Sequence, residues 1–241
     1  PSARKVVPTM VIAGADGCRE GWVVIREGAD GQISWEVMPS VHHLFELSAA
    51  PDLLAVDIPI GLPSSGSREC DVQARRLLGR GRASSVFPAP IRRVLTASSH
   101  AEASESRFLA EGKRISIQAW AIVPKIREVD EFMRGTHPTR DRVREVHPEV
   151  CFYYMAGGRP MSAAKKRKAG REERAALLRV QFGESVDAAL GDRRRLGCEA
   201  DDILDAFAAL WTARRIRGGN EVCLPHDPPL DEYGLRMEMV A

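Results

Sequence analysis

The sequence has no apolar run long enough to cross a membrane. Its longest uninterrupted apolar stretches, such as residues 206–211, fall far below the roughly 18 residues that a spanning helix requires. A secretory leader is not visible either. We therefore expect a cytoplasmic protein without a membrane partner, and we give residues 1–8 no weight in the fold.

Cysteine and an excess of charge of one sign are also scarce. The five cysteines are widely and irregularly spaced without a CxxC pair, which argues against a disulfide framework and against a zinc knuckle. The 35 basic and 33 acidic residues leave a net charge of +2, too small to identify a nucleic-acid-binding protein by charge alone. A phosphate-binding loop of the GxxxxGK type is absent. With 44% apolar and 28% charged positions, the 241 residues describe an ordinary globular chain.

What the sequence does contain begins with four strand-like runs, at residues 9–16, 21–26, 33–38 and 53–58. The Asp-Gly that ends the first run predicts a hairpin joined by residues 17–20. Helical spacing at residues 41–47 separates the third run from the fourth. The fourth run is continuously apolar, which is typical of a strand buried on both faces of a sheet and parallel to the first.

Apolar residues at spacings of three and four then predict helices at residues 68–78, 101–111, 117–133, 148–156, 172–182 and 199–217. A loop with two prolines at residues 84–90 interrupts the first group, and we interpret residues 63–141 as a helical insertion. A fifth strand is predicted at residues 142–146 and a terminal strand at residues 235–240. The chain is thus interpreted as one α/β domain over residues 9–241.

Aspartates stand at the ends of apolar runs, where acids are costly unless they are paired or bound to a cation. Asp16 ends the first strand, Asp57 ends the fourth, and Asp202 and Asp205 open the last long helix. Taken singly, each has an ordinary explanation, namely a hairpin turn, a strand end or a helix cap. In a sheet ordered three, two, one, four, however, the ends of the first and fourth strands are neighbours. A helix packed across that sheet brings its own acids to the same point.

Spacing within that helix favours Asp205. It lies three residues after Asp202 and four after Asp201, so it belongs to the shared face in either register. Clustered carboxylates repel one another, so either one takes up a proton or a multivalent cation sits among them. Oxygen ligands suit Mg²⁺ or Mn²⁺ better than zinc, and two such ions about 4 Å apart activate water and stabilise the leaving oxygen in phosphodiester hydrolysis.

Several ordered motifs carry a resemblance to a known family. They are GADGCREGWVV (residues 14–24), AVDIPIGLP (55–63), Cys70-Asp71, SSVFPAP (84–90), PKIREVD (124–130), EVHPE (145–149) and DDILDA (201–206). In these motifs, over roughly residues 11–240, the chain resembles domain-of-unknown-function family 429 (DUF429), regarded as predicted nucleases of the ribonuclease H-like fold. The resemblance implies a mixed five-stranded sheet in the order 3-2-1-4-5, flanked by helices, with the helical insertion between strands four and five.

The wider fold also implies roles for the aspartates. The Asp-Gly before a Gly-Trp hairpin is similar to the first strand of ribonuclease H, whose Asp binds metal, and this carries over to Asp16. Two Asp three residues apart before Ala-rich packing resemble the metal-binding final helix of RuvC-like resolvases, which carries over to Asp202 and Asp205. A second ligand is expected on the fourth strand, where Asp57 is the only acid in the matching run.

The acids and the histidine of EVHPE allow two interpretations. Glu149 in the first turn of a helix is favoured by the helix dipole, and His147 before Pro148 caps that helix. In the functional interpretation, Glu149 or Glu145 is a further metal ligand, and His147 is a catalytic partner for a proton or a phosphate.

Basic and hydroxyl side chains supply candidates for substrate binding. Lys125 and Arg127 could face phosphates, or they could belong to a surface helix paired with Glu128 and Asp130. Ser84 and Ser85, in the loop motif, are also candidate substrate ligands. The basic segment formed by residues 165–168 with Arg171 and Arg174 is either a solvated face or a nucleic-acid contact.

Three functional hypotheses follow. The first is a metal-dependent nuclease that uses Mg²⁺ or Mn²⁺ to cleave DNA or RNA. The second is a non-catalytic protein that binds nucleic acid through its basic segments. The third is an actin-like nucleotide-binding or phosphotransfer protein, whose fold also begins with an Asp-Gly hairpin. Such proteins duplicate the fold, and 241 residues with one first-strand motif are short for two copies.

Overall fold

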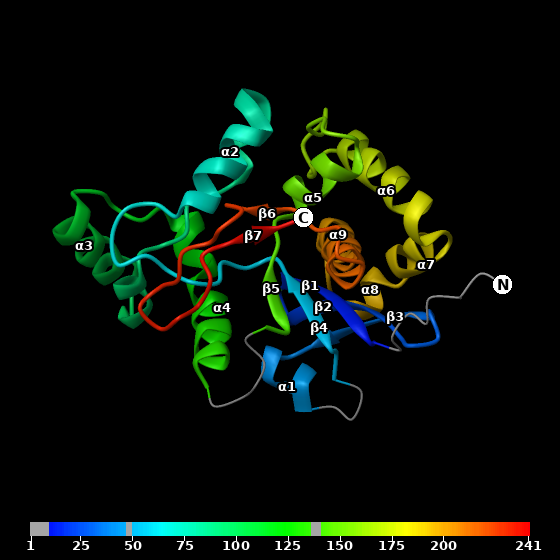
Figure 1. The fold of residues 1–241 in the computed structure, drawn as a ribbon, viewed down its shortest axis with the longest axis horizontal. Coiled ribbons are helices and arrows are strands. Elements are labelled where there is room, and N and C mark those ends of the chain that lie inside the picture. Colours follow the sequence, from blue (N-terminus) through cyan, green and yellow to red (C-terminus); the bar gives the residue numbers. More distant parts are fainter. Residues whose placement is uncertain (1–9, 47–49, 136–140) are drawn as a thin grey trace.

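The structure, a computed structural model, describes residues 10–46, 50–135 and 141–241. Its centre is a mixed sheet in the order β3-β2-β1-β4-β5, in which β2 is antiparallel to β1 and β3, and β4 is parallel to β1 and β5 (Figure 1). The strands are β1 (Ile12–Cys18), β2 (Gly21–Glu27), β3 (Ile33–Met38), β4 (Leu53–Val56) and β5 (Val143–Glu145). The predicted α/β class and strand order are confirmed. Residues 9, 47 and 136–140, assigned above to a strand, a helix and the insertion, lie outside the described residues.

The first hairpin is tighter than predicted. The two strands pair as far as Cys18 with Gly21, so only residues 19 and 20 form the turn. Gly21 permits this turn because its φ is +143° and a Cβ there would lie 2.1 Å from the carbonyl oxygen of Met38. Asp16 therefore lies inside β1, opposite Val23, and its interpretation as a turn residue is wrong.

Two layers of helices cover the two faces of this sheet (Figure 1). One layer consists of α5 (Pro148–Met155), α6 (Lys168–Phe182), α7 (Ser185–Gly191), α8 (Arg193–Leu196) and α9 (Ala200–Arg217). The other contains α1 (Val41–Glu46) and α4 (Ile117–Arg134). Helix α9 is apolar around most of its circumference because it lies between the sheet and the other helices of its layer.

Period-two alternation assigns each strand residue to one of these faces. In β1, Ile12 joins the core on the α9 side, whereas Ala13 and Ala15 join the core on the α4 side. In β4, Leu53 and Ala55 belong to the α9 side. Positions 14, 16 and 57 continue these two series, so the same face of the sheet presents both predicted strand acids to α9.

Between β4 and β5 the described elements are all helical. They are α2 (Glu69–Arg82), the 3₁₀ helices η1 (Ala83–Ser85) and η2 (Arg92–Thr96), α3 (His100–Glu111) and α4. Helix α4 belongs to the body of the domain, because Val123, Ile126 and Val129 are buried in the core that also contains Ala13 and Ala15. The insertion thus supplies one of the two helical layers.

The short helices α7 and α8 could not be predicted from apolar spacing. With seven and four residues they are too short to display helical periodicity. Gly191 is the last residue of α7, and Gly197 is the C-cap of α8. The terminal strand is also shorter than predicted, because only β7 (Met239–Val240) pairs, with β6 (Cys223–Leu224). None of the described helices combines the length and the apolar composition needed to span a bilayer.

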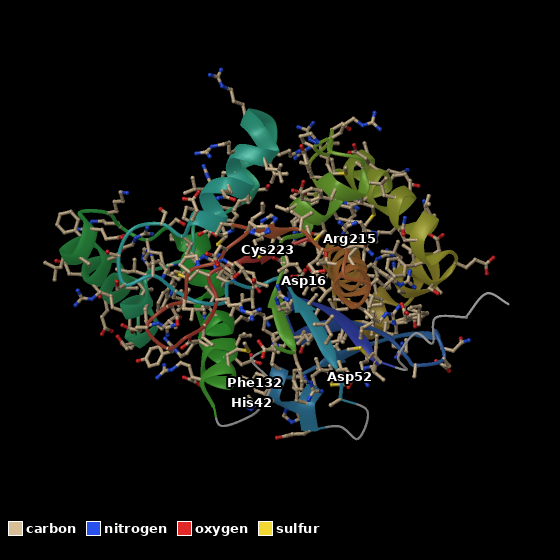
Figure 2. The ribbon with its side chains drawn as sticks, viewed as in Figure 1. Asp16, His42, Asp52, Phe132, Arg215 and Cys223 are labelled. Atoms are coloured by element: carbon tan, nitrogen blue, oxygen red, sulfur yellow. The ribbon has the colours of Figure 1, made fainter. Side chains whose placement is uncertain are left out.

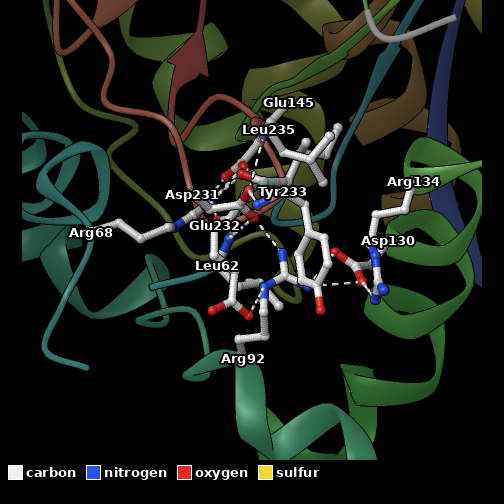
Figure 3. A network of polar contacts seen from close by, with 12 residues as sticks. Leu62, Arg68, Arg92, Asp130, Arg134, Glu145, Asp231, Glu232, Tyr233 and Leu235 are labelled. Atoms are coloured by element: carbon white, nitrogen blue, oxygen red, sulfur yellow. Dashed lines mark hydrogen bonds and ion pairs between the residues drawn. The ribbon is translucent and has the colours of Figure 1, made fainter. Parts of the chain in front are cut away.

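A buried polar network joins the insertion to the C-terminal segment (Figure 3). Arg92 donates hydrogen bonds to both carboxylate oxygens of Asp130 at 2.8 and 2.9 Å, and it also contacts Asp231. The ring of Tyr233 has the guanidinium carbons of Arg92 and Arg134 at 4.5 and 3.7 Å from its centroid. Arg92 is therefore a structural link between the insertion and the C-terminal segment.

Candidate metal centre

Three predicted aspartates meet at the end of the central strands. Asp16 comes from β1, Asp57 directly follows β4, and Asp205 lies in the second turn of α9. Each offers one carboxylate oxygen, and these three atoms lie within 4.8 Å of one another. Figure 2 shows Asp16 near the centre of the molecule, where the sheet meets α9. We call Asp16, Asp57 and Asp205 the acidic triad.

The acidic triad is held away from solvent. Asp16 is 8% exposed and Asp205 is 1% exposed. Burial, together with the charges of Asp57 and Asp205, raises the pKa of Asp16 well above its usual range. Burial also raises the pKa of Asp57 and that of Asp205 to about 6, although the nearby charge of Lys165 lowers both.

One carboxylate oxygen of the acidic triad has no hydrogen-bond donor. Oδ1 of Asp205 is buried and accepts no hydrogen bond from any described residue, whereas Oδ1 of Asp16 accepts one from the Gly17 amide at 2.8 Å. A buried oxygen without a donor costs about 1–3 kcal/mol unless another group satisfies it. A metal ion held by the acidic triad could satisfy Oδ1 of Asp205.

Lys165 is the site residue that sequence reasoning did not place. Its ammonium contacts Oδ2 of Asp205, and the neighbouring Lys166 binds Oδ2 of Asp201 at 2.7 Å. The sequence presents Lys165 only as part of a basic run. Its position depends on the path of the segment before α6, for which spacing carries no signal.

Glu149 and His147 flank the acidic triad at the start of α5. His147 caps the helix by accepting the Glu149 amide at its Nδ1 at 3.2 Å, and Pro148 occupies the first turn, as the capping interpretation predicts. Burial lowers the pKa of His147, so its imidazole is neutral at pH 7. Oε1 of Glu149 contacts Arg174, while its buried Oε2 accepts no hydrogen bond from the described chain.

Asp202 does not join the acidic triad. Its Oδ2 accepts a hydrogen bond from the Glu199 amide at 2.9 Å, which makes it part of a capping box at the start of α9. It lies one turn before Asp205, at the margin of the same cleft. Of the two aspartates assigned from the resolvase-like helix, only Asp205 reaches the strand acids.

Glu145 lies on the wrong face of the sheet to be a ligand of the acidic triad. It pairs in register with Val56, which belongs to the α4 side, so its carboxylate points away from α9. There Arg68 donates to both carboxylate oxygens at 2.6 and 2.7 Å, and the Ile60 amide donates to Oε2 at 2.6 Å (Figure 3). Glu145 is thus a structural anchor for the segment that follows Asp57.

The structure does not bring both Lys125 and Arg127, the two candidate substrate ligands in α4, to the acids. Lys125 lines the cleft, but its Nζ donates to the Gly21 carbonyl at 2.5 Å and lies 4.6 Å from the centroid of the Trp22 indole. Arg127 donates to the carbonyls of Leu95 and Ala97 at 2.7 and 2.9 Å and lines a different hollow.

The intrahelical pairing considered for these two cations is wrong. Glu128 instead accepts hydrogen bonds from the Trp22 indole and the Val41 amide, at 3.0 and 2.6 Å. Asp130 pairs with Arg92, in the network described above. Glu128 and Asp130 therefore fix neighbouring elements and do not pair with Lys125 or Arg127, although Asp130 also forms an ion pair with Arg134 within α4 at 3.3 Å.

A cleft of about 770 Å³ opens above the acidic triad. Its walls include Ser85 and Phe87 from the loop after α2, and Ile122 and Lys125 from α4. Ser84 is exposed and is not among the residues that line the cleft. The Ser85 hydroxyl donates to the Arg82 carbonyl at 2.6 Å, so its remaining capacity is as an acceptor.

Fold and site together define an α/β protein with a buried carboxylate triad that could hold a metal ion. The chain belongs to the family described as "Protein of unknown function (DUF429)", which matches residues 14–230. No curated protein and no solved structure matches the chain.

Proposed function

We propose that this protein is a metal-dependent nuclease that hydrolyses phosphodiester bonds of DNA or RNA, with Mg²⁺ or Mn²⁺ held by the acidic triad. The observation that carries the proposal is the convergence of three carboxylates, two buried and one half-buried, of which one has an oxygen that accepts no hydrogen bond from the described chain. The acidic triad contains only oxygen donors, which suit Mg²⁺ and Mn²⁺ better than zinc. The donor set therefore fits the cation that the function requires.

Residues of this chain supply the remaining parts of the reaction. A bound divalent ion would stabilise negative charge on the phosphoryl oxygens. Glu149 presents its free Oε2 to the cleft and can take one proton from the attacking water. The water oxygen bonds to phosphorus, the bond from phosphorus to the leaving oxygen breaks, and the leaving oxygen takes a proton from solvent. Atoms and charge balance without any oxidant or reductant.

The cleft also offers an aromatic surface for a base. Phe87 is 53% exposed although it is a large apolar side chain, and it lies in the cleft wall between the buried Val86 and the exposed Pro88. The Val86 carbonyl is fixed by Arg75 at 2.6 Å, which anchors the loop. Stacking of a nucleobase on an aromatic ring contributes about 1–3 kcal/mol. This wall supports nucleic acid as the substrate class.

The test of the function is a cleavage assay on single- and double-stranded DNA and RNA with Mg²⁺, Mn²⁺ or a chelator. We expect cleavage of at least one substrate with metal, none with the chelator, and none by Asp16→Asn. Equal residual activity of the wild type and Asp16→Asn would show that the site is assigned wrongly. Salt-sensitive binding without cleavage, unaffected by metal, would favour the non-catalytic alternative.

Removal of the Phe87 ring is expected to weaken substrate binding. Phe87→Ala should raise the KM for a single-stranded substrate about tenfold, since one stacking contact is lost, with kcat nearly unchanged. Phe108→Ala is the matched control, because that ring is 43% exposed on α3 but does not line the cleft. If both variants show the wild-type KM, Phe87 does not contact the substrate.

Metal binding is expected to depend on pH. Because the pKa of Asp57 and that of Asp205 lie near 6 in the folded protein, against 3.8 for an unperturbed Asp, the folded state holds extra protons between about pH 4 and 6. Their contribution to stability is therefore present at low pH and is lost as the pH rises through 6. A metal ion must displace these protons at pH 5 but not at pH 7.5.

The measurement is the rise in Tm that saturating Mn²⁺ produces at pH 7.5 and at pH 5. At pH 5 each of these carboxylates is only about one-tenth ionised, so the apparent metal affinity should fall at least tenfold. The rise in Tm should therefore be clearly larger at pH 7.5, and Asp57→Asn should remove it at both values. An equal rise at both pH values would contradict the assignment of these carboxylates as ligands.

A further inference from the structure

The acidic triad is already in contact with a cation of the protein itself, the ammonium group of Lys165. The Lys165 ammonium contacts Oδ2 of Asp205. The side chain of Lys165 is 38% exposed, and that of Asp205 is 1% exposed. Lys165 lines the same cleft as Asp16, Asp57 and Asp205, so a positive charge of the chain lies beside the carboxylates that would hold a metal ion.

The segment that carries Lys165 is fixed on both sides. The fully buried Arg174 donates from Nη1 to the carbonyls of Ala163 and Gly170, at 3.0 and 2.7 Å. The carboxylate of Glu173 accepts the amides of Ser162 and Ala163 at 2.8 to 3.1 Å. These contacts, made by two residues of α6, hold the backbone before and after Lys165.

A close backbone contact and an ion pair of Arg174 complete this support. A Cβ on Gly170 would lie 2.1 Å from the Ala164 carbonyl oxygen, so the segment folds tightly onto the start of α6. Arg174 also contacts Glu149 through Nη2, which ties the segment to α5 beside the acidic triad. Lys165 is thus positioned by buried groups, unlike a solvated surface lysine.

The charge of the site matches this arrangement. The acidic triad, when ionised, carries a formal charge of minus three, and Lys165 reduces it to minus two. One divalent ion neutralises that charge, whereas two would leave the buried site with an excess of positive charge, which is costly. The charge of Glu149 is already matched by Arg174.

We propose that the site binds one divalent ion and that the Lys165 ammonium, which contacts Asp205, supplies the positive charge that a second ion would otherwise provide. This inference rests on the proposed nuclease function. In the hydrolysis described above, Lys165 stays protonated and stabilises negative charge on the phosphate and the leaving oxygen, while the bonds formed and broken remain the same.

The experiment counts bound Mn²⁺ by electron paramagnetic resonance and calorimetry, and measures kcat on any substrate that the wild type cleaves. The variants are Lys165→Met, which keeps the apolar stem, and Lys165→Arg, which keeps the charge. Lys113→Met is the matched control, because that lysine is exposed and does not line the cleft. Circular dichroism checks the fold of each variant.

The wild type is expected to bind one Mn²⁺. Lys165→Met should bind Mn²⁺ at least as tightly, because a repelling charge is gone, and yet its kcat should fall about a hundredfold or more. Lys165→Arg should regain part of kcat, and Lys113→Met should match the wild type in both measurements. A variant that loses only stability would not bind Mn²⁺ more tightly, so a structural role is distinguishable.

Two results would overturn the inference and leave the nuclease proposal standing. One is a wild type that binds two Mn²⁺. The other is a Lys165→Met variant that cleaves as fast as the wild type or faster, which is the result expected if the Lys165 ammonium only competes with the metal ion for the carboxylates. Failure of the nuclease proposal gives a different result, because the wild type then cleaves no nucleic acid under any metal condition.

Discussion

Replacing Asp205 with Asn is expected to abolish metal-dependent cleavage. An amide keeps the shape of the side chain but removes the charge that binds both Lys165 and the metal ion. The ion supplies several kcal/mol of charge stabilisation in the transition state, so its loss should lower kcat by about a thousandfold or more. Mn²⁺ binding, measured by calorimetry, should be lost together with activity.

Asp202→Asn is the matched control, one helical turn away. Asp202 accepts the Glu199 amide as part of the helix cap, and an Asn side-chain oxygen can do the same. We therefore expect Asp202→Asn to keep Mn²⁺ binding and to stay within a few-fold of the wild-type kcat. If the two variants lose activity equally, the ligand set extends along α9, and if neither does, Asp205 is not a ligand.

Alternation along the strands is the part of the site that the sequence could predict. The order of the strands and the parallel pairing of β1 with β4 make the ends of these strands neighbours. Asp16 and Asp57 then fall on one face of the sheet, because each lies an even number of residues after the first residue of its strand. Both first residues, Ile12 and Leu53, face α9. The small residues after Asp205, Ala206 and Ala209 among them, permit the close approach of the last helix to the sheet.

Register and tertiary partners are what the sequence could not supply. Glu145 is as close to a strand end as Asp57, but its pairing with Val56 turns it to the opposite face, and that register depends on β5 docking beside β4. Spacing favours Asp205 but also places Asp202 on the same side of the helix, and only the depth of each position against the sheet separates the cap, Asp202, from the candidate ligand, Asp205. Lys165 reaches the site by a path that residues of α5 and α6 fix.

The geometry of the acidic triad depends on how closely α9 approaches β1. Gly14 is the point of contact, because a Cβ built there would lie 2.1 Å from the Leu210 amide nitrogen and 2.3 Å from the Ala206 carbonyl oxygen. Both atoms belong to the backbone, so no side-chain rotation can relieve the clash. Asp16 lies two residues beyond Gly14, and Asp205 precedes Ala206, so a displacement of the helix away from β1 separates these two carboxylates.

The single methyl group added by Gly14→Ala is therefore expected to destabilise the fold and to move the carboxylates of the acidic triad apart. Overpacking of a tight core costs about 1–3 kcal/mol and occasionally more, and a backbone clash places this variant at about 3 kcal/mol or above. Urea unfolding measures the loss, and calorimetry on the folded fraction should show weaker Mn²⁺ binding.

Gly81→Ala provides the comparison, because Gly81 lies in α2 with nothing within 4 Å of the added Cβ. Alanine there lowers the entropy of the unfolded chain without a clash, so stability should stay the same or rise by up to about 1 kcal/mol, with Mn²⁺ binding unchanged. Equal urea midpoints for the two variants would mean that α9 does not approach β1 as closely as the structure has it. A Gly14→Ala protein that is destabilised but binds Mn²⁺ normally would instead separate the packing of α9 from the geometry of the acidic triad.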